Sequence, residues 1–303
     1  MAALTLSEQT FHESAVVSEA SAHLATTPSF KETVKTRSGS PCFDALAMTR
    51  CLPHDILEAL PRLLVNRQGT TPDAYMRTEN FLGHVRADRS YRLTAEGFVE
   101  APEATPEALP KPVEPPHVVL DGTWDQTVDL TIDDANILGG NGRYLLCQGQ
   151  EELIIPVADC TAEHLAWYDS QLMAVGDVTR FRTSGNLPVT LTSVGKDYPA
   201  NYLLDAQRGG GAYLEVHDRP HFHMPLDRDA GGYLILGKQD EKGIRRVSAF
   251  RIPFGFGVHM APWAIHCDAY VVGRYLVIYS ATPEFSTVIV RKSCGALAPV
   301  SFA

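Results

Sequence analysis

Short runs of alternating hydrophobic and polar residues fill most of the chain after residue 116. In TVDLTI (residues 127–132), Val128, Leu130 and Ile132 alternate with polar residues, as in a β-strand that buries one face. Turn-forming stretches such as GGNG and SGN separate the runs. Strands at this spacing predict a β-sandwich or β-barrel, interrupted by one helix-like segment, TAEHLAWYDSQLMAV. Nine further runs are strand candidates: GRYLLCQ, ELIIPV, DVTRFR, PVTLTSV, AYLEV, GYLILGK, RRVSAFRI, RYLVIYS and STVIVRK.

The chain before residue 116 has a different pattern. The stretch TPDAYMRTENFLGHV (residues 71–85) predicts a short helix. Six prolines in APEATPEALPKPVEPP (residues 101–116) predict an extended connector without a helix. We therefore expect a mixed, partly helical extension over residues 1–115 and a β domain over residues 116–303. Another short helix is predicted in LPHDILEALPRLLVN, where one loose stripe contains Ile56, Leu57, Leu60, Leu63 and Leu64.

Composition limits the classes of function. The 303-residue chain has a net charge of −10 and no run of basic residues, which argues against binding to nucleic acid. No stretch approaches the ~18 consecutive apolar residues of a membrane span, and the N-terminus lacks the features of a signal peptide. The six cysteines show no CxxC spacing and are expected to be reduced thiols. These features predict a cytoplasmic protein that binds no membrane.

Three histidines lie within seven residues in HDRPHFHMPL (residues 217–226). His221 and His223 are two residues apart, so they share one face of a strand, and His217 is also an even number of residues away. His266 follows a proline turn in VHMAPWAIHCD and could complete a three-histidine metal site. The alternative is that these histidines lie in a surface loop or are hydrogen-bonded within the core. A carboxylate ligand is less clear; Asp227 follows His223 by four residues.

The order of these motifs resembles the cupin superfamily, whose members are jelly-roll β-barrels. The first cupin motif is matched by HFHMPLDRDAGGYLILG and the second by PWAIH. The resemblance implies metal ligands at His221, His223 and His266, with Asp227 in the acidic position. Two glycines stand where cupins usually have a glutamate, so the fourth ligand is either Asp227 or water.

Within the cupins, residues 176–292 are most similar to the ureidoglycolate lyase family. The stretches that carry this likeness are HDRPHFHMPL, AFRIPFGFGVHMAPWAIH and RYLVIYS, and His217, His259 and Trp263 keep the family's order. The resemblance implies a lyase or hydrolase that acts on a small carboxylate.

Three functions follow from these features. The first is a metal-dependent lyase or hydrolase, in which a divalent Fe, Zn, Mn or Ni ion polarises an oxygen of the substrate. In it His259 or His217 moves the proton, and Arg251, Lys238 and Trp263 bind the substrate. The second is a non-haem iron dioxygenase, and the third is a non-catalytic cupin that binds a small ligand. We also expect a small-molecule substrate as the partner and a homo-oligomer, a homodimer, as the assembly.

Overall fold

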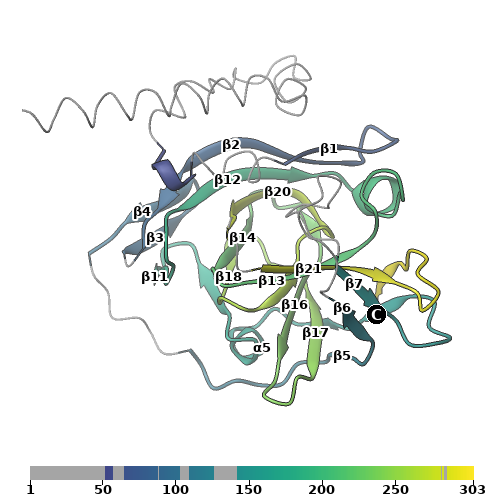
Figure 1. Cartoon of the computed structure of the whole chain (residues 1–303). Coiled ribbons are helices and arrows are strands. Elements are labelled where there is room, and N and C mark those ends of the chain that lie inside the picture. The colour runs from purple at the N-terminus through teal and green to yellow at the C-terminus, as the bar shows by residue number, and fades with distance from the viewer. Residues whose placement is uncertain are drawn as a thin grey trace, which may run out of the picture.

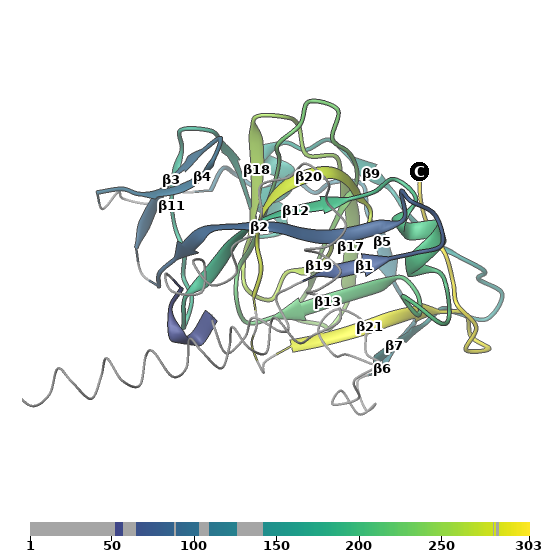
Figure 2. The same ribbon diagram turned by 90° about the horizontal axis from the view of Figure 1, so that it is seen from above.

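The computed structural model describes residues 52–56, 65–87, 89–102, 109–125, 142–280, 282 and 285–303. Over these residues the protein is mainly β. Two large sheets curl around a common interior, as the two perpendicular views show (Figure 1, Figure 2). This barrel-like arrangement agrees with the β class predicted from the sequence. All nine of the predicted runs that follow TVDLTI contain a strand, whereas TVDLTI itself lies outside the described residues.

The first large sheet contains strands from both halves of the chain. Its order is β1 (Asn66–Gln68), β2 (Tyr75–Val85), β12 (Leu187–Val194), β20 (Val271–Ile278), β14 (His221–Pro225), β18 (Phe256–Met260) and β10 (Gln171–Ala174), with β15 (Gly231–Gly232) paired to β20. The strands β1 and β2 come from before the expected domain boundary at residue 115. The two predicted domains therefore share one sheet.

The second large sheet closes the other side of the interior. Its order is β5 (Val118–Leu120), β17 (Arg245–Phe250), β16 (Leu234–Gln239), β19 (Ile265–Cys267), β13 (Tyr213–His217), β21 (Phe285–Arg291), β7 (Gly142–Leu145) and β6 (Thr123–Asp125), with β9 (Val157–Ala158) paired to β17.

Smaller elements cover the outside of these sheets. A three-stranded sheet has the order β11 (Val178–Arg180), β3 (Ser90–Thr94) and β4 (Gly97–Glu100), and β22 (Val300–Phe302) pairs with β8 (Leu153–Ile155). The helix α5 (Ala162–Trp167) and the π-helical turn η1 (Pro199–Leu203) lie in the connections.

Strand β14 is buried on both faces. Phe222 and Met224 belong to a hydrophobic cluster that also contains Leu93 of β3 and Phe181, which follows β11. The alternate residues, His221 and His223, therefore point to the opposite face, into the barrel. The three-stranded sheet thus forms a third layer behind the strand that presents the histidines.

The helix predicted over residues 71–85 is wrong, because these residues form β2. Met76 and Thr78 are buried while their neighbours are partly exposed, and β2 pairs with β12 over eight register positions. Pairing with a neighbouring strand overrides the weak helical periodicity of this stretch. The helix predicted near Ile56 is seen over residues 54–56, and its remainder lies outside the described residues.

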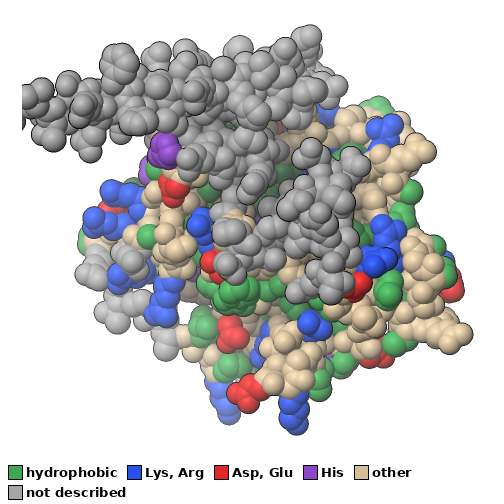
Figure 3. Space-filling view, in the orientation of Figure 1, with side chains coloured by type: hydrophobic (Ala, Val, Ile, Leu, Met, Phe, Trp, Pro, Cys, Tyr) green, Lys and Arg blue, Asp and Glu red, His purple; other side chains and the backbone are tan. Residues whose placement is uncertain are grey.

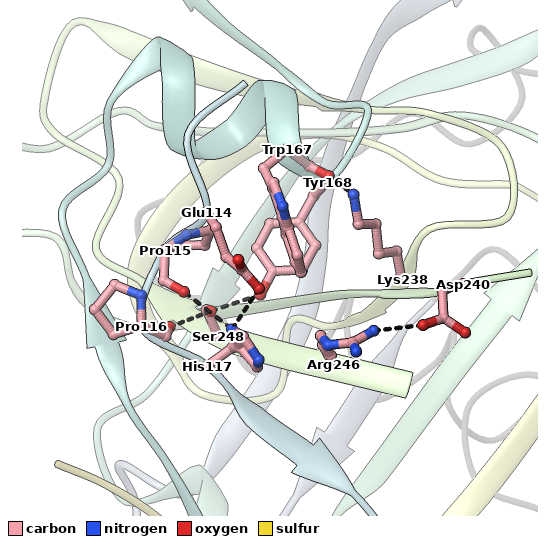
Figure 4. A network of polar contacts seen from close by, with 10 residues as sticks. All are labelled: Glu114, Pro115, Pro116, His117, Trp167, Tyr168, Lys238, Asp240, Arg246 and Ser248. Carbon is pink, nitrogen blue, oxygen red and sulfur yellow. Dashed lines mark hydrogen bonds and ion pairs between the residues drawn. The ribbon is translucent and has the colours of Figure 1, made fainter. Parts of the chain in front are cut away.

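The proline-rich connector is extended wherever it is described, over residues 101–102 and 109–116, and it lies against α5 and β17 (Figure 4). Ser248 Oγ donates a hydrogen bond to the carbonyl oxygen of Pro116 (2.5 Å), and it accepts one from the hydroxyl of Tyr168 (2.6 Å). The ring of Trp167 stacks on His117, with a centroid separation of 5.5 Å. These contacts fasten the connector to the barrel.

Ser248→Ala is expected to lower the free energy of unfolding by about 1–3 kcal/mol, because it leaves the buried Tyr168 hydroxyl without its acceptor. Urea denaturation measures the change. Ser301→Ala is the matched control, since Ser301 donates to Glu152 in an exposed pair and its loss should cost less than about 0.5 kcal/mol. Equal effects of the two substitutions would show that the Ser248 contacts add nothing to stability.

The surface agrees with the composition. On the face in Figure 3, basic and acidic side chains are interspersed over the described residues. Among the helices that the structure describes, none is long and apolar enough to cross a membrane. Cys147, Cys160, Cys267 and Cys294 are free thiols, as expected, and Cys42 and Cys51 lie outside the described residues.

Candidate metal centre

Three strands bring the histidines together. His217 ends β13, and a short turn through Pro220 places His221 at the start of β14. His266 lies on β19, which pairs with β13 through the single register position Glu215–His266. Because paired residues share a face, Glu215 and His266 both point into the barrel. His217 lies two residues beyond Glu215 and points the same way.

The imidazoles of His217, His221 and His266 form a compact group, called here the histidine triad. One nitrogen from each ring lies within 4.8 Å of the other two. The ring centroids are 4.5 Å apart for His217–His221 and for His221–His266, and 4.9 Å apart for His217–His266. Nitrogens on one tetrahedral metal at ~2.0–2.1 Å are about 3.4 Å apart, so small side-chain rotations would bring all three to one ion.

The nitrogens of the triad are free to bind a metal. Both ring nitrogens of His217 and His221 are buried and have no hydrogen-bond partner, and neither does Nε2 of His266. Nδ1 of His266 lies 2.9 Å from the carbonyl oxygen of Ala264, an arrangement that places a proton on Nδ1 and leaves the Nε2 lone pair free. Buried polar atoms in proteins are nearly always bonded, so this set fits a metal ion.

Burial sets the protonation of the triad. It holds the pKa values of His217 and His221 well below the usual range, and a charge on His266 would lower them further. Burial also lowers the pKa of His266, but Glu215 outweighs it, because its carboxylate can accept a hydrogen bond from the protonated ring and attracts the positive charge, so the pKa is raised. His217 and His221 are therefore neutral near pH 7, which is the form of histidine that binds metals.

Glu215 is a functional candidate that the sequence analysis missed. Its side chain is buried, its Oε1 lies 3.2 Å from Nε2 of His266, and its Oε2 has no partner. Two ligands at about 2.1 Å from one metal are roughly 3.0 Å apart at right angles and roughly 3.4 Å apart in a tetrahedron, so this spacing suits a carboxylate beside a histidine ligand. The sequence feature that could have identified Glu215 is its position in YLEVH, two residues before His217 and therefore on the same face of the strand.

His223 lies next to the triad rather than within it. Its ring centroid is 6.0 Å from that of His221, and its Nε2 is 3.8 Å from Oδ2 of Asp268. The hydroxyl of Tyr213 donates to Oδ1 of Asp268, and that of Tyr279 donates to Oδ2 (3.5 Å). Burial lowers the pKa of His223 to about 4. From the sequence, His223 was expected among the ligands and His217 in catalysis; in the structure His217 lies within the compact group and His223 lies beside it.

Asp227 is not brought to the triad. Its carboxylate accepts two hydrogen bonds from Arg274, at 2.9 Å and 2.6 Å, near the surface. The hydrogen bonds from Arg274 lower the pKa of this carboxyl. A bidentate ion pair accounts for Asp227, and the acidic position beside the histidines belongs to Glu215.

His259 points away from the barrel interior. It is the register partner of Phe222 on β14, so it faces the three-stranded sheet. Its Nδ1 lies 3.2 Å from Oγ1 of Thr179, and its ring packs against Phe181 at a centroid distance of 4.8 Å. This position does not suit the proton transfer that the sequence analysis assigned to it.

Of the three expected substrate-binding residues, only Trp263 lies beside the triad. Its backbone N–H donates to the carbonyl oxygen of His217 (2.7 Å), and its side chain is 57% exposed. Its φ of 68° is unusual for a residue other than glycine, and such strain is often found at functional sites. Lys238 instead lies 3.8 Å from the ring of Trp167, and Arg251 is exposed.

The position of His259 predicts a dependence of stability on pH. Burial lowers its pKa in the folded protein to about 4, below the unfolded value of 6.5. The unfolded chain therefore binds the proton more tightly, and stability is lost as pH falls from about 6.5 to about 4. His259→Gln should reduce this loss by up to about 3 kcal/mol in denaturation measured at both ends of that range. An unchanged pH dependence in the variant would contradict the assignment.

Two comparisons with known proteins found no match. No protein-family model matches the chain. No curated protein matches it either.

Proposed function

We propose that this chain is a metal-dependent enzyme with a cupin-like barrel, a lyase or hydrolase that acts on a small carboxylate. One observation carries the proposal: three buried histidines from separate strands converge, and their free nitrogens have no protein partner. The curled, mainly β architecture and the resemblance of HDRPHFHMPL and PWAIH to cupin motifs support it.

The residues suit a catalytic metal rather than a purely structural one. His217, His221 and His266 would hold the ion, and Glu215 would lie beside it. Structural zinc sites are usually closed by four protein ligands, whereas catalytic sites keep a position for substrate or water. A bound divalent ion would supply Lewis acidity toward an oxygen of the substrate.

Arg219 is the residue that we propose to bind the carboxylate of the substrate. It lies in the turn between His217 and His221, and its charge is close enough to lower the pKa of His217. Its Nε is buried and has no hydrogen-bond partner. An arginine binds a carboxylate through two parallel hydrogen bonds, which fixes the orientation of the bound molecule. In this proposal Arg219 binds the substrate in place of Arg251 and Lys238, which were expected to do so from the sequence.

Metal analysis of the purified full chain tests the proposal. We expect about one equivalent of a divalent transition metal, with activity on small carboxylates that is lost on chelation and restored by the metal. Iron together with oxygen consumption would instead favour a dioxygenase built on the same ligands. A chain that retains no metal after incubation with zinc, cobalt or iron would refute the metal centre and favour a non-catalytic binding protein.

A further inference from the structure

We propose that the barrel interior next to the triad, around His223, Glu215 and Thr287, is a subsite for a hydrogen-bond donor of the substrate, such as a hydroxyl or an amide N–H. This inference rests on the proposed function, because the metal and Arg219 would hold the remainder of the same substrate. It adds to the proposed function that the substrate must carry a hydrogen-bond donor in addition to its carboxylate.

His223 provides the first observation. Its side chain is 1% exposed, and neither ring nitrogen has a hydrogen-bond partner. Asp268 faces Nε2 at 3.8 Å, too far for a hydrogen bond but close enough to favour a proton on that nitrogen. Nδ1 is then an acceptor. A metal bound by the triad would leave this acceptor unsatisfied, at a cost that buried polar groups in native proteins seldom carry.

Glu215 and Thr287 provide the second observation. They are register partners on β13 and β21, so their side chains lie side by side on the inner face. Oε2 of Glu215 and Oγ1 of Thr287 are both buried without a partner. If Oε1 of Glu215 lies beside the metal, Oε2 remains as a second free acceptor. Two acceptors and one hydroxyl require an occupant that donates hydrogen bonds.

The charges of the interior set the orientation of the substrate. Two carboxyl groups line this part of the interior, Glu215 beside His266 and Asp268 beside His223, whereas Arg219 lies in the segment between His217 and His221. An anionic group next to Glu215 and Asp268 would be repelled, and the same group next to Arg219 would be attracted. The substrate is therefore a small carboxylate with a neutral donor group, bound with the carboxylate toward Arg219 and the donor toward His223.

The test compares two probes on the cobalt-loaded full chain. Glycolate and methoxyacetate have the same carboxylate and the same oxygen, but only glycolate has a proton to donate. Titration of each, followed by the visible absorption of Co²⁺, should give a Kd about ten times lower for glycolate, as expected for one or two buried hydrogen bonds. A ratio near one in the wild type would overturn the inference and leave only ordered water in the subsite.

Two variants test whether the preference for glycolate over methoxyacetate comes from this subsite or from the metal itself. His223→Phe keeps a ring without nitrogens, and Thr287→Val keeps the shape without the hydroxyl. Both should bind cobalt as the wild type does, and the Kd ratio should fall to about two or less in His223→Phe and by a smaller factor in Thr287→Val. A ratio that stays at the wild-type value in both variants would refute the subsite. Failure of the wild type to bind cobalt would instead refute the proposed function itself.

Discussion

Replacement of His217 by alanine is expected to weaken the binding of a divalent metal by more than about 100-fold, whereas replacement of His223 leaves it nearly unchanged. Loss of a residue that merely orients a ligand typically costs ~10–100-fold in metal affinity, and the loss of a ligand itself should exceed this. His217 has a nitrogen within 4.8 Å of those of His221 and His266, and His223 has no place in that group. Competition against a coloured chelator, with zinc or cobalt, measures both affinities.

The experiment needs two reference variants: one that removes another histidine of the triad and one that removes a histidine outside it. His221→Ala should behave like His217→Ala, because both the sequence and the structure place His221 among the ligands. His259→Ala should behave like the wild type in metal binding, because its ring lies on the other face of the sheet. If His223→Ala lost the metal and His217→Ala kept it, the ligand set expected from the cupin resemblance would be correct and the triad wrong.

Phe222→Ala is expected to lower the free energy of unfolding by about 3–5 kcal/mol, the range for a large aromatic residue removed from a packed core. Phe222 is fully buried between the two histidines of β14. Its ring packs edge-on against Phe98 at a centroid distance of 4.9 Å, and it covers Gly257, where an added Cβ would lie 2.2 Å from the ring. The truncation would leave a cavity between the barrel and the third layer. Thermal unfolding should show a Tm lower by roughly 10 °C.

Phe254→Ala is the matched control. The side chain of Phe254 is 44% exposed, and its described contact is with the guanidinium of Arg228 at 4.9 Å from the ring centroid. Its loss should cost less than about 1 kcal/mol. Equal destabilisation by the two substitutions would mean that the cluster around Phe222 is not packed as described.

Local alternation predicted only part of the site: AYLEV covers most of β13, whereas β19, which carries His266, was not among the predicted strands. In β13 and β14, the two-residue period correctly placed His221 and His223 on one face. The same rule misjudged residues 71–85, because the pairing of β2 with β12 depends on a segment more than a hundred residues away. The periodicity of a single segment carries no information about such a neighbour.

The membership of the triad could not be derived from spacing alone. Alternation gives the face of a strand but not the depth of each residue inside a barrel. His217 and His221 meet because only three residues, 218–220, carry the chain from β13 in one large sheet to β14 in the other. Glu215 approaches His266 only through the register between β13 and β19. The cupin resemblance placed the carboxylate after the histidines, at Asp227, whereas Glu215 precedes them in the sequence.

The sharing of one sheet by both halves of the chain has a consequence for how the protein can be divided. A fragment that starts at residue 116 would lack β1 and β2 and leave the eight residues of β12 with an unpaired edge. Bare edges of this kind recruit strands from other chains, which leads to aggregation. The strands β1 and β2 thus protect the solubility of the barrel, and insolubility of the shorter fragment would say nothing about the metal centre.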